Sequence, residues 1–230
     1  MVDNTPQTPP EYQARGQSVS PTAGFTYVFQ QEQWRQTIAI GALLTALSVT
    51  LVPTILIAGY GWRVTAHAQR DAPPPVFNDW GRLFIEGCRA IIALILPSIS
   101  IIVGTSLVWL TARFAVFGYL PLELDSMPAL STWVIGALLT GFLGLYLTPA
   151  GFVNAVRDNS LLSACSPSIL ISTISPSYLL LWVIAFSTAT GLVLTSLIFS
   201  LIPVVGVILG AASTFYSVIA LVALFAFGLR

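Results

Sequence analysis

The sequence predicts an all-α fold, a polytopic helical membrane protein with about five transmembrane helices and two amphipathic segments at the interface. Residues 159–229 contain no Asp, Glu, Lys or Arg. The whole chain is 56% hydrophobic and 8% charged, whereas a soluble domain carries about 25% charged residues. Because so few polar side chains cannot cover a water-facing surface, lipid is the expected solvent of this chain.

The N-terminal residues differ from the rest of the chain. They are polar and rich in proline, so they bury too little apolar area to offset the entropy lost on ordering. We therefore predict a disordered tail over 1–23 and a single helical transmembrane domain over 24–230. No signal peptide is expected, because the first apolar run begins only near Ile38.

Five segments are long and apolar enough to cross a bilayer, which takes about 20 mostly apolar residues. They remain when loop residues are removed from the charge-free windows of the chain. The predicted spans lie near 37–59, 89–118, 131–152, 177–200 and 203–228. The last two are separated by Ile202-Pro203, so they are expected to form an antiparallel hairpin.

The first predicted span leaves two topologies open. One helix over 37–59 would place the N-terminus outside the cell. A break of this apolar run at Pro53 would instead make a re-entrant hairpin and keep the N-terminus inside.

Orientation follows from arginine counts, because cytoplasmic loops are enriched in positive residues. Residues 60–89 hold four arginines, whereas 119–130 hold none. The sequence therefore places 60–89, 152–176 and the C-terminus in the cytoplasm.

The two long connections are predicted to lie at the membrane interface. In the first, Pro73–Pro75 are extended, and Asn78 or Asp79 caps a helix that enters the second span. Charged positions of that helix share one side, and Leu83, Phe84 and Gly87 share another. The charged positions are Arg82, Glu86 and Arg89.

The second connection contains the apolar run SILISTI, which is too short to span a bilayer. Ser166 is the expected cap of that short helix, and Ser177 is the expected N-cap of the fourth span.

Small residues mark expected helix contacts. Gly206 and Gly210 form a G-x-x-x-G motif in the fifth span, and Ala137 and Gly141 have the same spacing in the third. Such positions let helix backbones approach closely. We expect packing within the chain at these four residues.

The sequence offers no persuasive catalytic or metal site. His67 is the single histidine and is expected to face solvent or headgroups. Cys88 and Cys165 are expected to be free thiols, and Glu123 and Asp125 to belong to a solvated loop. We therefore predict no catalytic residue, no metal and no cofactor.

Four arginines near the ends of the predicted spans are candidates for lipid-headgroup contact, because long cationic side chains reach toward the interface. They are Arg63, Arg82, Arg89 and Arg113. A net charge of zero gives no reason to expect nucleic acid as a partner.

The order of several short motifs resembles a known family. The motifs are FTYVF from Phe25, AGYGWRV (58–64), FNDWGRLFIEGCRA (77–90), LYLTPAGFVNAV (145–156), SPSYLLLW (175–182) and IPVVGVILG to FG (202–228). Over roughly 24–230 this order is similar to a prokaryotic, mainly archaeal, membrane family, domain of unknown function 4013. The resemblance implies an integral membrane protein and supplies no activity.

Together these observations predict an uncharacterised multi-pass protein of the cytoplasmic membrane that is not an enzyme. We expect a structural or assembly component that contacts lipid, itself or another membrane protein. The alternative is a transporter or permease subunit for a small apolar or lipid-like solute. That alternative predicts a cavity between the second, fourth and fifth spans.

Overall fold

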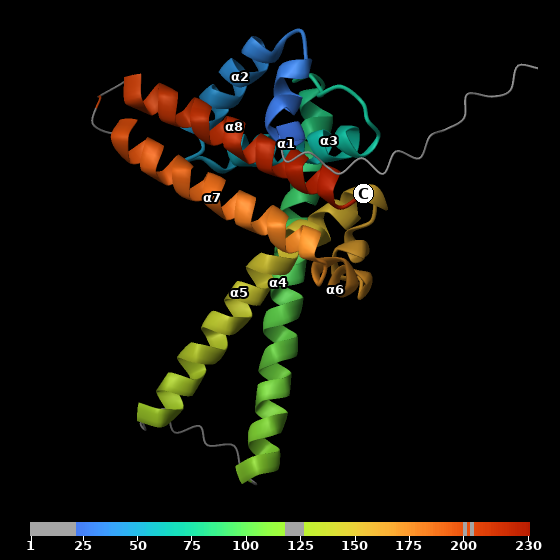
Figure 1. Cartoon of the computed structure of the whole chain (residues 1–230), viewed down its shortest axis with the longest axis vertical. Coiled ribbons are helices and arrows are strands. Elements are labelled where there is room, and N and C mark those ends of the chain that lie inside the picture. The colour runs from blue at the N-terminus through green and yellow to red at the C-terminus, as the bar shows by residue number, and fades with distance from the viewer. Residues whose placement is uncertain (1–21, 118–126, 200–201, 203–204) are drawn as a thin grey trace, which may run out of the picture.

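The computed structural model describes residues 22–117, 127–199, 202 and 205–230, and this part of the chain contains helices and no strand (Figure 1). The elements in order are α1 Thr22–Tyr27, the 3-10 helix η1 Val28–Gln30, α2 Trp34–Ala46, α3 Leu51–Gln69, α4 Trp80–Phe117, α5 Met127–Arg157, the 3-10 helix η2 Leu161–Cys165, α6 Ser168–Thr173, α7 Pro176–Phe199 and α8 Val205–Gly228. The predicted all-α class is confirmed. Of the predicted tail, Thr22 and Ala23 already belong to α1, and 1–21 lie outside the described residues.

The prediction of one helix over 37–59 is wrong, because a turn separates α2 from α3 (Figure 1). The break lies just before Pro53, which occupies the first turn of α3. There its missing N–H costs nothing, whereas a continuous helix would need that donor and would clash with the preceding turn. The hydroxyl of Thr50 also bonds to the Leu47 carbonyl at 3.0 Å, which helps close the turn.

Helix α4 carries the interfacial entry and the second span without interruption, as the sequence indicated. Asp79 begins it with a left-handed φ of 50°, and its carboxylate accepts the backbone N–H of Arg82 at 3.4 Å. Leu83 and Gly87, which were expected on one side of this helix, are both buried. Phe84 is 39% exposed, so the three residues expected on one side of the helix differ in burial.

Helices α4 and α5 form a hairpin whose far half extends away from the other helices (Figure 1). Two hydroxyl contacts join them. Ser98 Oγ lies 3.2 Å from Thr148 Oγ1, and the Thr140 hydroxyl donates to Thr105 Oγ1 at 3.0 Å. Interhelical hydroxyl bonds of this kind hold helices together where no water competes.

The predicted hairpin of the last two spans is confirmed by α7 and α8, which lie side by side (Figure 1). The cap of α7 is Ser175, not Ser177, because the Tyr178 N–H donates to Ser175 Oγ at 3.3 Å. Pro176 then occupies the first helical position, which needs no N–H. Helix α6 has Pro167 at its N-cap, with no side-chain cap bond, so the expected cap Ser166 lies one residue too early. Its Oγ still accepts the Ser168 N–H at 3.4 Å.

The connection after α3 and the C-terminus lie at the same end of the molecule as α1. Tyr27 donates from its hydroxyl to the Ala72 carbonyl at 2.8 Å, so α1 and the connection after α3 lie together. Arg230 pairs with Asp71 at 2.7 Å, which brings the C-terminus to the same end of the molecule. Nε2 of Gln69, at the end of α3, donates to the Val153 carbonyl at 3.4 Å. The C-terminal part of α5 therefore lies at this end of the molecule as well.

Three of the described helical segments are long and apolar enough to cross a membrane: Trp80–Leu107, Gly136–Arg157 and Val205–Gly228. A shorter apolar stretch covers Pro176–Leu192 of α7. These helices indicate a membrane protein.

Candidate functional site: an arginine-lined groove

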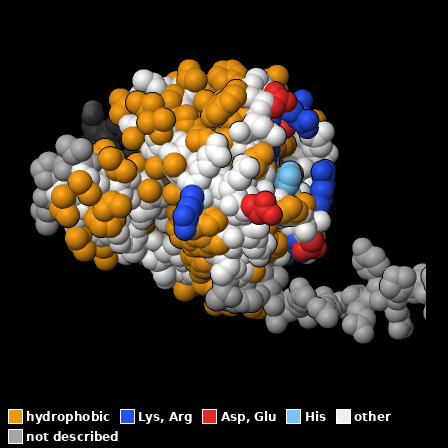
Figure 2. Space-filling view, turned by 90° about the horizontal axis from the view of Figure 1, so that it is seen from above, with side chains coloured by type: hydrophobic (Ala, Val, Ile, Leu, Met, Phe, Trp, Pro, Cys, Tyr) orange, Lys and Arg blue, Asp and Glu red, His pale blue; other side chains and the backbone are white. Residues whose placement is uncertain are grey.

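A groove of about 700 Å³ opens where α3, the connection after it, the start of α4 and the end of α5 meet. Seven charged side chains line it, five arginines and the two carboxylates of Asp79 and Glu86. Seen from above, most of the charged side chains and the histidine gather at one side, and hydrophobic side chains cover much of the rest (Figure 2). The arginines are Arg63, Arg70, Arg82, Arg89 and Arg157.

Arg63 forms the floor of this groove and is 9% exposed. Its Nε donates to the carboxylate of Glu86, with which it forms an ion pair. Its Nη1 donates to the carbonyl and side-chain oxygens of Asn78 at 2.7 and 3.0 Å, and Nη2 to the Asp79 carbonyl at 3.3 Å. Glu86, Asn78 and Asp79 therefore already occupy the guanidinium of Arg63, and headgroup contact at this residue stays a prediction.

The other three arginines of that prediction differ in environment. Arg82 donates to Glu86 at 2.9 Å, but its side chain remains 73% exposed. Arg89 is exposed and makes no hydrogen bond or ion pair within the described part of the chain. For both, headgroup contact stays a prediction. Arg113 belongs to α4, but its side chain lies outside the described residues.

Three further groove residues were not singled out from the sequence as members of a binding site. Arg70 follows the end of α3, and Arg157 ends α5 and lies 3.5 Å from Asp158. His67 Nδ1 lies 2.9 Å from the Pro73 carbonyl, so this nitrogen carries the proton and Nε2 is left for other contacts. Arg70 could have been proposed from the sequence, because it is one of the four arginines in 60–89. No local spacing links Arg157 to Arg70, because they lie at the ends of different helices and meet only in the folded chain.

The chemistry that this set supports is anion binding. Arginine presents N–H donors in a fixed fork that matches carboxylate and phosphate oxygens, and five arginines exceed the two lining carboxylates. Within the described residues, no group of three His, Cys, Asp or Glu side chains could hold a metal ion.

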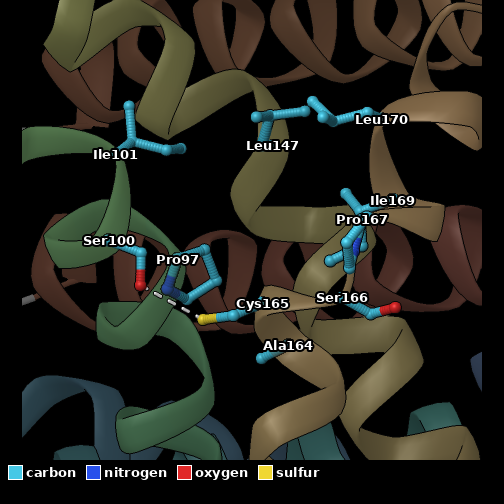
Figure 3. Close-up of a pocket in the computed structure, with 10 residues that line it drawn as sticks. All are labelled: Pro97, Ser100, Ile101, Leu147, Ala164, Cys165, Ser166, Pro167, Ile169 and Leu170. Atoms are coloured by element: carbon cyan, nitrogen blue, oxygen red, sulfur yellow. Dashed lines mark hydrogen bonds between the residues drawn. The ribbon is translucent and has the colours of Figure 1, made fainter. Parts of the chain in front are cut away.

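A second, smaller cavity of about 250 Å³ lies between α4, α5 and the segment from η2 to α6 (Figure 3). Its walls are mostly apolar, with Pro97, Ile101 and Leu147 among them. One polar contact crosses it, between Ser100 Oγ and Cys165 Sγ at 3.3 Å. Both cysteines are free thiols, as expected.

The four predicted packing residues have different surroundings. A Cβ at Gly206 would lie 1.8 Å from the Phe199 carbonyl oxygen, so α8 touches the end of α7 there. At Gly210 and Gly141 nothing lies within 4 Å of that position, and Ala137 is exposed. For these three residues, a packing role stays a prediction and would need another chain.

A close crossing of α3 and α4 involves two glycines that were not among the predicted packing residues. A Cβ at Gly59 of α3 would lie 2.1 Å from the Leu83 carbonyl oxygen, and one at Gly87 of α4 would lie 2.0 Å from that of Ile55. The two backbones therefore touch at this crossing, one residue from Glu86. Gly59 and Gly87 are far apart in sequence, so spacing within one helix could not reveal the pair.

A scan against protein-family models matches residues 42–198 of this chain to a family described as a protein of unknown function, DUF4013. The motifs expected at either end, near Phe25 and after Ile202, lie outside the matched range. No curated protein and no solved structure matches the chain. The match covers well over half of the 230 residues, and the chain therefore belongs to the DUF4013 family.

Proposed function

We propose that this protein is a non-enzymatic structural or assembly component of the cytoplasmic membrane. The observation that carries the proposal is the far half of the α4–α5 hairpin, which stands apart from the other helices (Figure 1). Its exposed apolar surface needs lipid or another membrane protein to cover it. Exposed side chains on it are Ile99, Ile102, Val103, Leu107, Leu138, Leu139, Phe142 and Leu145.

The proposed topology has four spans, α4, α5, α7 and α8, with α2 and α3 as a re-entrant hairpin. Two features support it over the five-span alternative. The tip of the hairpin is apolar and open, since Val49 is 98% and Leu51 72% exposed. The Tyr27–Ala72 bond returns the chain after α3 to the level of α1. Both termini then lie on one side of the membrane.

That side is proposed to be the cytoplasm. The connection after α3, the end of α5 and the C-terminus lie together, and most of the described arginines lie there. The positive-inside rule assigns such an end to the cytoplasm.

An assembly role can be tested by photo-crosslinking from the exposed hairpin. A photoreactive amino acid replaces Leu139 or Phe142 in the full chain, and a control replaces Leu162, which is 81% exposed in the connection after α5. We expect one defined protein adduct, to a second copy or another membrane protein, from the two hairpin positions. Adducts to lipid alone at both positions would contradict the assembly role.

The permease alternative gains no support from the two cavities described above. It requires a cavity between α4, α7 and α8, whereas these cavities are lined by α3, α4, α5 and the connections beside them. Uptake of a solute by vesicles that contain the pure protein would favour the permease.

A further inference from the structure

We propose that the arginine-lined groove binds the phosphate headgroup of an anionic membrane lipid, whose acyl chain lies along the exposed face of α4. The inference rests on the membrane placement proposed above and names a ligand for the groove. Its volume of about 700 Å³ falls within the usual range of small-molecule sites, about 300–1,000 Å³.

The charges of the groove are balanced unevenly. Glu86 binds two arginines at once, Arg63 through one oxygen and Arg82 through the other. Arg70 and Arg89 are exposed and have no counterion among the described residues. Two cations in one groove without a carboxylate partner create a site for an anion, and the planar guanidinium of arginine can donate two N–H groups to two oxygens of one phosphate.

The surface next to Arg89 indicates that the anion belongs to a lipid. Ile85, Ile92 and Ile99 recur every seven residues of α4, so they share one face of the helix with Arg89. They are 57%, 45% and 51% exposed. A free phosphate would leave this face bare, whereas a phospholipid would cover the arginine with its headgroup and the isoleucines with its chain.

The fixed position of Arg63 supports this arrangement. Its bonds to Asn78 and Asp79 hold the connection against α3, so the groove does not have to assemble when the ligand arrives. A preformed site avoids the entropic cost of ordering its walls. Arg63 is therefore a positioning residue, and Arg70 and Arg89 are the expected phosphate ligands.

The test measures binding of phosphatidylglycerol and phosphatidylcholine to the purified full chain in a neutral detergent, by native mass spectrometry. We expect the wild type to prefer phosphatidylglycerol. The double variant Arg70→Gln with Arg89→Gln should bind it about a hundredfold more weakly, since each charge-assisted bond contributes about tenfold. The matched control Arg35→Gln removes an exposed charge from α2, outside the groove, and should keep the preference.

A double variant that folds and keeps the preference overturns the inference. If glycerol 3-phosphate or inorganic phosphate binds as tightly as the lipid, the ligand is a soluble anion and the lipid assignment is overturned. Loss of lipid affinity in Ile92→Asn, with glycerol 3-phosphate affinity unchanged, would support the path of the chain. Release of the protein from native membranes by alkaline carbonate would instead refute the membrane placement itself.

Discussion

Replacing Gly87 by alanine should destabilise the protein, although alanine is the better helix former. The ideal Cβ at this position would lie 2.0 Å from the carbonyl oxygen of Ile55 and 2.7 Å from its Cγ2. A carbon and a carbonyl oxygen in contact are about 3.3 Å apart, so α3 and α4 would have to separate by about 1.3 Å. The obstacle is backbone, which cannot turn aside as a side chain can.

The magnitude follows from two opposing terms. Glycine to alanine inside a helix gains about 1 kcal/mol, whereas added atoms in a closely packed contact cost about 1–3 kcal/mol. Because the clash here is with backbone, we expect the upper part of that range and a net loss of about 2 kcal/mol. The same separation would disturb the Arg63–Glu86 pair beside the crossing.

The assay is unfolding in mixed micelles by titration with a denaturing detergent, followed by circular dichroism. Gly104→Ala is the matched control, because it makes the same change in the same helix with nothing within 4 Å of the new Cβ. Its free energy of unfolding should be unchanged or raised by up to about 1 kcal/mol. A Gly87→Ala protein as stable as the wild type would refute the close crossing of α3 and α4.

Three further predictions concern charge, topology and pH. Glu86→Leu leaves buried Arg63 without its carboxylate and should cost about 3–5 kcal/mol of unfolding free energy. The double variant with Arg63→Met should recover most of that loss, and a double variant as unstable as the single one would contradict the pairing. Cys165 is exposed and should react with an impermeant maleimide only after the cells are permeabilised; labelling of intact cells would reverse the proposed orientation. Burial raises the pKa of Tyr27 above its usual value of about 10, so the folded state holds this proton more tightly. Stability present below pH 10 should fall as the pH rises further, and a Tyr27→Phe protein should lose less in alkaline thermal melts.

The helical class and most helix positions could be predicted from the sequence, because lipid imposes simple rules. In a bilayer every backbone group must be paired within its own segment, so long apolar runs become helices. The segments near 89–118, 131–152, 177–200 and 203–228 each correspond to one helix of the structure. Asp79 as a cap could be recognised because capping depends only on neighbours in sequence.

The candidate site could be predicted only in part. Arg82, Glu86 and Arg89 were placed together on one side of a helix, since their spacing is local. The same reasoning assigned Arg63 to the headgroups, because a span-end arginine in isolation is expected to reach for them. Its buried partner lies on another helix, 23 positions away, and local spacing carries no information about such a pair.

The sequence by itself determined the solvent, the helical class, the charge-free stretch over 159–229 and the presence of an arginine-rich connection, since these depend on composition and local periodicity. The tertiary structure alone decided the division of the first apolar run at 47–50, the backbone contact at Gly59 and Gly87 and the joining of Arg157 to the other groove arginines. The glycine contact and the joining of Arg157 depend on which distant segments meet, and helix packing selects those partners through the shape and small residues of both surfaces at once. The break before Pro53 is local, and the sequence left it open beside a continuous helix because proline is compatible with either the first turn or a kink.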